Sequence, residues 1–244
     1  MTTRLADKVA LITGASAGIG YATARALARE GANVVVTARR EERLQQLVRE
    51  VEALGARSVY IVGDAATEAT ARASVDCALS EFGRIDILIN NAGVGNYKNL
   101  IDTSAEEYDQ IMDVNMRSTF LFTRHVVPVM QKQQQGLILL VSSMAGLYGF
   151  PGQAVYCASK FAQVGFAQAL DKELRSYGIK VGSVCPGGVK TEFAIGKGRT
   201  EEGVANSSML NAEDVAQAIT FACTQPPGAR IMQIQMRTMA ENLN

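Results

Sequence analysis

The chain has 244 residues with 24 basic and 24 acidic side chains, so its formal net charge is zero. It therefore lacks the positive excess with which nucleic-acid-binding proteins neutralise phosphates, and we expect no nucleic acid partner. Hydrophobic residues make up 48% of the sequence and charged residues 20%, which is typical of a globular protein with a large core. We expect a single domain over residues 1–244.

The chain carries no targeting or metal-binding signal. Its first eight residues lack the apolar core of a signal peptide, and no run approaches the ~18 apolar residues of a membrane span, so we expect a cytoplasmic protein without a membrane partner. The four cysteines form no CxxC pair, which argues against a zinc site or a disulfide framework. His125 is the only histidine, so a multi-histidine metal site is excluded.

Apolar runs alternate with helical patterns along the chain. Six short runs rich in Val, Ile and Leu predict strands buried on both faces: Val9–Thr13, Val34–Thr37, Val59–Val62, Ile85–Asn90, Leu137–Ser142 and Val181–Cys185. Longer segments with helical spacing lie between them: Ala22–Glu30, Glu41–Leu54, Thr67–Phe82, Ala105–Gln131 and Tyr156–Tyr177. This alternation predicts an α/β protein with a doubly wound parallel sheet, a Rossmann fold of three αβα layers.

A glycine-rich turn follows the first strand and opens the first helix. Glycines let the backbone turn tightly and approach a pyrophosphate, which the N–H groups and dipole of the helix N-terminus then hold. The order of strand, turn and helix favours this interpretation over a turn that binds nothing. The candidate cofactor-binding residues in the turn are Gly14, Ser16, Gly18, Ile19 and Gly20.

The end of the second strand indicates which dinucleotide is bound. A site for NAD places a carboxylate there for the ribose 2′-hydroxyl, but this chain has Ala38 followed by Arg39 and Arg40. Guanidinium groups suit a 2′-phosphate, so we expect NADP rather than NAD. One of the two arginines is expected to be a solvated residue at the start of a helix, and Arg39 is the favoured phosphate ligand.

Polar residues and glycine follow the third and fourth strands. Asp64 and Ala65 come after the third strand, where the Asp64 carboxylate is placed either to accept from the adenine amino group or to cap a helix. Asn91, Ala92 and Gly93 follow the fourth strand. Ligands of doubly wound folds bind at this carboxyl edge of the sheet, so all five residues are candidates for the cofactor site.

Tyr156 and Lys160 are the candidates for acid–base chemistry. A spacing of four residues places both on one helix face, and Tyr156 is the only one of seven tyrosines with a lysine at that offset. An adjacent ammonium would lower the pKa of a phenol, and Ser143, at the end of a preceding strand, would stabilise an oxyanion. Carbonyl reduction needs these groups and NADPH. The alternatives are an ordinary amphipathic-helix tyrosine and a strand-end serine.

Together these motifs resemble the short-chain dehydrogenase/reductase family over essentially the whole chain. The resemblance matches Ser143, Tyr156 and Lys160 to the family's catalytic set and implies that Lys160 also bonds the nicotinamide ribose. It maps Asn115 to a helix asparagine that holds a water linking the lysine to solvent. It further implies cofactor contacts from a loop near the nicotinamide and assembly into homo-dimers or homo-tetramers. The loop residues are Pro186, Gly187, Val189 and Thr191.

The substrate is less constrained. The C-terminal segment 229–237 and Thr191-Glu192-Phe193 resemble NADP-dependent dehydrogenases of serine and other short 3-hydroxy acids more than 3-oxoacyl carrier-protein reductases. The second class remains an alternative, as does a non-catalytic module that senses dinucleotides. Residues 191–208 are expected to form a flexible substrate loop. Candidate pocket residues are Met144, Tyr148, Phe150, Gln153 and Phe193.

Overall fold

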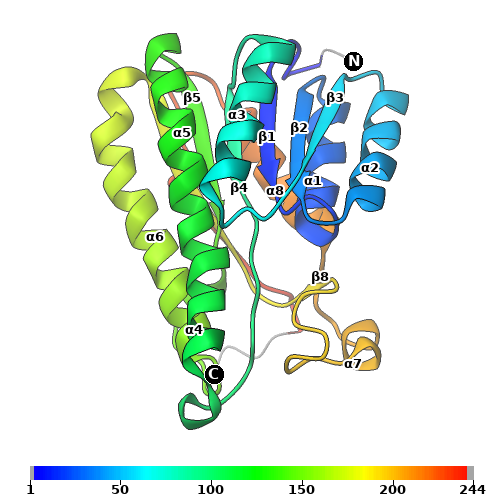
Figure 1. Cartoon of the computed structure of the whole chain (residues 1–244), viewed down its shortest axis with the longest axis vertical. Coiled ribbons are helices and arrows are strands. Elements are labelled where there is room, and N and C mark those ends of the chain that lie inside the picture. The colour runs from blue at the N-terminus through cyan, green and yellow to red at the C-terminus, as the bar shows by residue number, and fades with distance from the viewer. Residues whose placement is uncertain (1–2, 241–244) are drawn as a thin grey trace.

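The computed structural model describes residues 3–240, so the outermost residues of the predicted domain 1–244 lie outside the described part. Seven parallel strands form one sheet in the order β3-β2-β1-β4-β5-β6-β9 (Figure 1). The strands are β1 Val9–Thr13, β2 Asn33–Ala38, β3 Ser58–Val62, β4 Ile87–Asn90, β5 Gly136–Val141, β6 Ile179–Pro186 and β9 Gln233–Met236. The predicted doubly wound α/β fold is confirmed.

Helices cover both faces of the sheet. Helices α1 (Gly18–Arg29), α2 (Glu41–Ala53) and α8 (Ala212–Cys223) pack on one face. Helices α3 (Glu68–Phe82), α5 (Ser118–Gln133) and α6 (Ala154–Leu174) pack on the other (Figure 1). The three predicted layers are therefore present.

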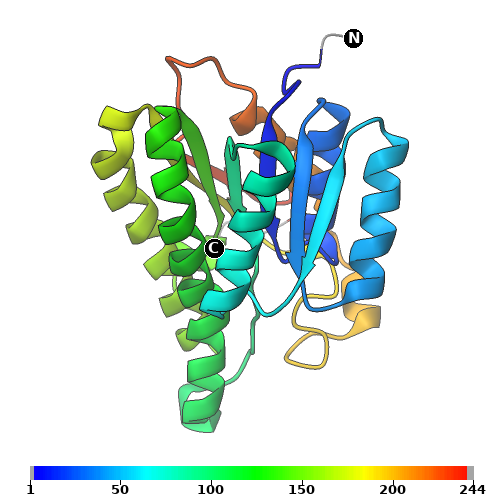
Figure 2. The same cartoon turned by 45° about the horizontal axis from the view of Figure 1, so that its top comes forward.

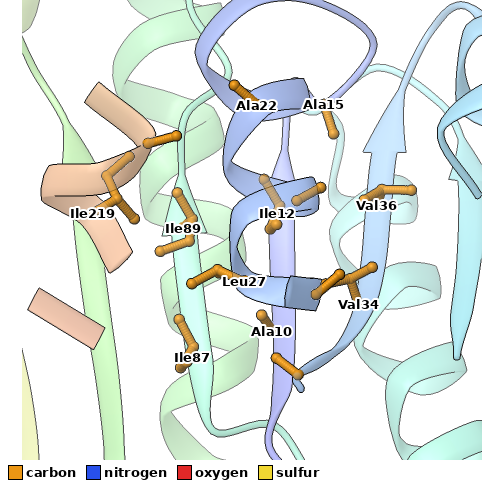
Figure 3. Close-up of a cluster of buried hydrophobic side chains, with 14 of the residues drawn as sticks. Ala10, Ile12, Ala15, Ala22, Leu27, Val34, Val36, Ile87, Ile89 and Ile219 are labelled. Atoms are coloured by element: carbon orange, nitrogen blue, oxygen red, sulfur yellow. The ribbon is translucent and has the colours of Figure 1, made fainter. Parts of the chain in front are cut away.

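The alternation of side chains along each strand builds two separate cores. In β1, Ala10 and Ile12 point toward α1, whereas Val9 and Leu11 belong to the core on the other face. Figure 3 shows the first core, where Leu27 of α1 lies near Ile87 and Ile89 of β4, and Ile219 of α8 lies near Ile89. Because both faces are covered, most strand residues are apolar, which explains the apolar runs in the sequence.

The connections at the carboxyl ends of the strands are long and carry the site. Residues 91–104, with a 3₁₀ turn at Leu100–Asp102, and residues 187–211 both extend beyond this edge of the sheet (Figures 1 and 2). The second segment contains β7 (Val189–Lys190), helix α7 (Glu201–Ala205) and β8 (Leu210–Asn211), with β7 and β8 paired. The predicted substrate loop is thus partly structured, and its flexibility stays a prediction.

Three elements differ from the sequence-based expectation. The expected helix Ala105–Gln131 is helix α4 (Ala105–Met112) joined to α5 by a π-helical turn, Asp113–Arg117. Helix α8 and strand β9 carry no prediction at all. A capping box between Asn211 and Asp214 marks the start of α8, so sequence alone offered a signal for it. The sequence of β9, Gln-Ile-Gln-Met, is only half apolar, so it lacks the apolar run by which the other strands were predicted.

Candidate functional site

A cleft of about 850 Å³ runs along the carboxyl edge of the sheet. We call it the dinucleotide cleft. Every predicted cofactor residue except Gly20 lines it: Gly14, Ser16, Gly18, Ile19, Arg39, Arg40, Asp64, Ala65, Asn91, Ala92, Gly93, Tyr156, Lys160, Pro186, Gly187, Val189 and Thr191. Residues from six separate parts of the chain therefore meet in one place, as the edge position predicted.

The glycine turn presents free donors at the start of α1. The N-cap residue, Ala17, makes no side-chain cap, and the first turn of α1 contains no acidic residue. The backbone N–H groups and the positive helix end are thus available to an anion. Gly18 has φ +56°, a left-handed conformation that disfavours any other residue. This cradle fits the pyrophosphate of a dinucleotide.

Gly20 does not line the cleft and packs against the residues that do. A Cβ at this position would lie 2.5 Å from Nδ2 of Asn91 and 2.6 Å from the carbonyl oxygen of Gly14. The Asn91 amide itself donates to the carbonyl oxygens of Thr13 and Gly14, at 2.9 and 3.1 Å. Gly20 is therefore needed for close packing of the turn, and its cofactor contact stays a prediction.

Thr13 was not singled out from the sequence but holds two parts of the cleft together. Its hydroxyl accepts from the backbone N–H groups of Asn91 and Ala92, both at 2.9 Å. The glycine turn and the segment after β4 are thus fixed to each other. A threonine at a strand end gives no distinctive sequence signal for this contact.

The two arginines after β2 have different surroundings. Arg40 donates to the Ser16 hydroxyl at 3.1 Å and forms an ion pair with Glu192 at 2.7 Å. Arg39 is exposed, lines the cleft and has no ion-pair partner among residues 3–240. Asp64, further along, accepts from the backbone N–H of Ala66, whereas Thr67 caps α3, so the helix-cap alternative for Asp64 is wrong.

Tyr156 lines the same cleft and is buried. Its ring packs against Tyr97 and Phe193, with centroids 6.1 and 5.7 Å away. Burial raises the pKa of Tyr156, and this effect outweighs the hydrogen bond with Ser143 and the charge of Arg199, which lower it. The side chain is therefore a protonated phenol near neutral pH in the cofactor-free protein.

Lys160 lies beside this phenol, with Nζ 5.8 Å from the centroid of the Tyr156 ring. Its ammonium donates to the carbonyl oxygen of Val141 and to Oε1 of Gln163, each at 3.0 Å. Burial lowers the pKa of Lys160 to about 8. Contrary to the expected activation of the phenol, burial dominates the pKa of Tyr156 in the chain itself.

Ser143 lines the cleft close to Tyr156, whereas Asn115 lies behind it. The Ser143 hydroxyl accepts from the backbone N–H of Ala145 at 3.1 Å. Asn115 is fully buried in the π-helical turn and bonds the backbone of Val94 and the hydroxyl of Ser159. Its side chain connects the segment after β4 to α6, and its predicted part in the catalytic set stays a prediction.

Beyond Tyr156, the cleft is lined by aromatic and basic groups that the sequence did not single out together. The Arg199 guanidinium lies 5.5 Å from the ring of Tyr97 and 5.7 Å from that of Phe193. Met144, Phe150 and Gln153 also line the cleft, as predicted. Tyr148 does not; it is half-exposed beneath Arg237.

Residues 3–240 contain neither a candidate membrane span nor a candidate metal cluster. No helix in this part of the chain is both long and apolar enough to cross a membrane. No group of three His, Cys, Asp or Glu side chains is placed to hold a metal ion.

This chain is similar to several oxidoreductases, among them the following three. Cyclopentanol dehydrogenase of Comamonas sp. is 42% identical, covering 77% of this chain and 75% of its own length. An alcohol dehydrogenase of the archaeon Thermococcus sibiricus, solved with 5-hydroxy-NADP, has a TM-score of 0.88 at 26% identity and 97% and 99% coverage. A 3-ketoacyl-(acyl-carrier-protein) reductase of Brucella melitensis, solved with NADH, has a TM-score of 0.87 at 31% identity and 96% and 98% coverage.

These relatives are oxidoreductases that differ in substrate and in bound dinucleotide. The family model described as short chain dehydrogenase matches residues 8–202, which include the glycine turn, Tyr156 and Lys160. The match covers well over half of the chain. The chain belongs to the short-chain dehydrogenase family.

Proposed function

We propose that the protein is an NADP(H)-dependent oxidoreductase that interconverts a carbonyl compound and an alcohol. The observation that carries the proposal is one continuous cleft that is lined both by the two arginines after β2 and by the buried Tyr156–Lys160 pair. The arginines suit a 2′-phosphate, the start of α1 suits a pyrophosphate, and the pair suits proton transfer.

In the reduction direction, NADPH held in the cleft would supply the hydride for the carbonyl carbon. Tyr156 donates its phenolic proton to the carbonyl oxygen, and Ser143 donates a hydrogen bond to the same oxygen. Lys160 places a positive charge beside the phenolate that forms. Tyr97 and Phe193 pack around the phenol and exclude water from it.

The direct test is oxidation of NADPH by the purified protein with aldehydes, ketones, 3-oxo acids and a 3-oxoacyl carrier-protein thioester. We expect turnover with at least one carbonyl class. A dinucleotide sensor would bind NADPH without turnover with any of them. Preference for the carrier-protein thioester over free acids would favour a carrier-protein reductase.

For cofactor choice, we expect Arg39→Ala to weaken NADP(H) selectively, because only that cofactor carries a 2′-phosphate. A lost charge-assisted contact of about 1.5–3 kcal/mol corresponds to a roughly 10- to 100-fold loss of kcat/KM for NADPH. The ratio of kcat/KM for NADPH and NADH measures the effect. An equal loss for both cofactors would contradict the assignment of Arg39 to the phosphate.

We further propose short 3-oxo and 3-hydroxy acids as the substrates. Arg199 and Lys197 are the basic side chains that line the cleft near Tyr97 and Phe193, and no carboxylate among residues 3–240 pairs with Arg199. The acidic lining residues, Asp64 and Glu192, lie at the adenosine side or pair with Arg40. An anionic group of the substrate would thus meet a positive field.

The substrate proposal predicts that Arg199→Gln raises KM for a 3-oxo acid by about 10- to 100-fold, the effect of one lost charge-assisted hydrogen bond. The matched control is the methyl ester of the same acid, which carries no charge and whose KM should change less than threefold. Steady-state kinetics with both compounds measures the difference. An equal change for acid and ester would show that Arg199 shapes the pocket without binding the carboxylate.

A further inference from the structure

Gln163 makes an unusual connection inside the site. It lies one turn after Lys160 on α6 and is fully buried, although no motif singles it out. Its Oε1 accepts from Nζ of Lys160 at 3.0 Å. Its Nε2 donates to the carbonyl oxygen of Asn115 at 2.8 Å and to the hydroxyl of Thr119 at 2.9 Å. One side chain therefore spans from the ammonium to the π-helical turn.

The orientation of this amide is determined by its neighbours. The opposite orientation would turn the NH₂ group toward the Lys160 ammonium and the amide oxygen toward the carbonyl oxygen of Asn115. Both contacts would then join like groups and leave buried polar atoms unpaired. The Thr119 hydroxyl donates to the carbonyl oxygen of Asn115 at 2.8 Å and accepts from Gln163, which completes the network.

The network also determines which hydrogen of the Lys160 ammonium is available to the cleft. A carbonyl oxygen has two lone pairs, and that of Asn115 already accepts hydrogen bonds from Thr119 and Gln163. An ammonium has three hydrogens. Lys160 donates one of them to the carbonyl oxygen of Val141 and a second to Oε1 of Gln163. Lys160 lines the dinucleotide cleft, so its third hydrogen is left for the cleft side.

We propose that Gln163 is a positioning residue that directs Lys160 toward the cleft and raises the proton affinity of Lys160. The Gln163 amide does this by forming the bridge between Lys160 and Asn115. An acceptor on the ammonium favours the charged form, which opposes the effect of burial. A primary amide neither gains nor loses a proton near neutral pH, so proton exchange of Lys160 takes place on the cleft side. The proposal rests on the acid–base role of the Tyr156–Lys160 pair.

This interpretation changes the role expected for Asn115. The family resemblance predicts a water between this residue and the lysine, whereas here the Gln163 side chain makes both contacts directly. Replacing glutamine with a side chain of similar size but no polar atoms would break the bridge. A smaller side chain would break it and leave room for a water.

The test compares Gln163→Leu with Gln163→Ala in the cofactor-free protein labelled with ¹³C-lysine. The pKa of Lys160 is read from the titration of its Cε resonance, assigned by its absence in Lys160→Met. We expect Gln163→Leu to lower the pKa of Lys160 by about one unit, because the ammonium loses an acceptor. Gln163→Ala should lower it less, because a water replaces the amide oxygen.

Thr119→Val is the matched control, because Thr119 belongs to the same buried network but does not contact Lys160. We expect it to lower the melting temperature without moving the pKa of Lys160. An unchanged pKa in Gln163→Leu, or equal shifts in all three variants, would overturn the proposal. The titration needs no turnover, so it tests the proposal on Gln163 even if no carbonyl compound proves to be a substrate.

In the active enzyme, the alkaline limb of kcat/KM should move in the same direction as the pKa of Lys160. Gln163→Leu should shift this limb to lower pH by about one unit, with the largest loss of rate above the new pKa. A uniform loss of rate at every pH would indicate a structural role only. It would contradict the proposal even if the variant folds normally.

Discussion

Tyr156→Phe is expected to reduce kcat/KM by about 10²- to 10⁴-fold, the range that a positioned proton donor contributes. The substitution removes one oxygen and keeps the ring between Tyr97 and Phe193, so the aromatic packing is retained. Binding of NADPH and the melting temperature should therefore change little. Steady-state kinetics, cofactor fluorescence and thermal unfolding measure the three quantities on one preparation.

The matched control is Tyr97→Phe, which removes a hydroxyl group from the neighbouring ring of the same cluster. We expect its kcat/KM to stay within about threefold of the wild type, because Tyr97 has no proposed proton to transfer. If both variants lost activity equally, the effect would come from the polarity of the pocket. If Tyr156→Phe lost less than tenfold, the phenol would not be the proton donor.

The sequence predicted the parts of the site that short segments encode. The glycine turn, the two arginines after β2 and the Tyr156–Lys160 pair each depend on spacing within one strand–turn–helix unit. The parallel sheet then brings them to one edge, because all of its strands end there. Local sequence and topology together were therefore sufficient for most residues that line the cleft.

The remaining residues depend on contacts between distant segments. Arg199 and Phe193 meet Tyr97 only because residues 187–211 fold back over the segment after β4. Gln163 and Asn115 meet only because the π-helical turn presents a carbonyl oxygen to α6. No periodicity in the sequence marks that turn, so a continuous helix was the natural prediction.

Lys160→Met is expected to abolish most activity and to change how stability depends on pH. Below about pH 8, Lys160 is charged in the folded and the unfolded states, and burial of the charge destabilises the fold. Between about pH 8 and the ordinary lysine pKa of 10.5, the unfolded state binds more protons, so this penalty disappears as pH rises. Relative to Lys160→Met, the wild type should therefore gain up to about 3 kcal/mol of unfolding free energy across this interval.

Denaturant unfolding of both proteins at pH 7 to 10.5 measures this difference, because other titrating groups cancel between them. A constant difference across the interval would show that Lys160 is not the buried titrating group.

In the same pH series, any remaining alcohol oxidation by Lys160→Ala should have a higher pH optimum than the wild type, since the phenol of Tyr156 loses its cationic neighbour and keeps its proton to higher pH. An unshifted optimum together with a normal stability change would separate the two roles: Lys160 would be a buried charge that holds the cofactor and does not assist proton transfer.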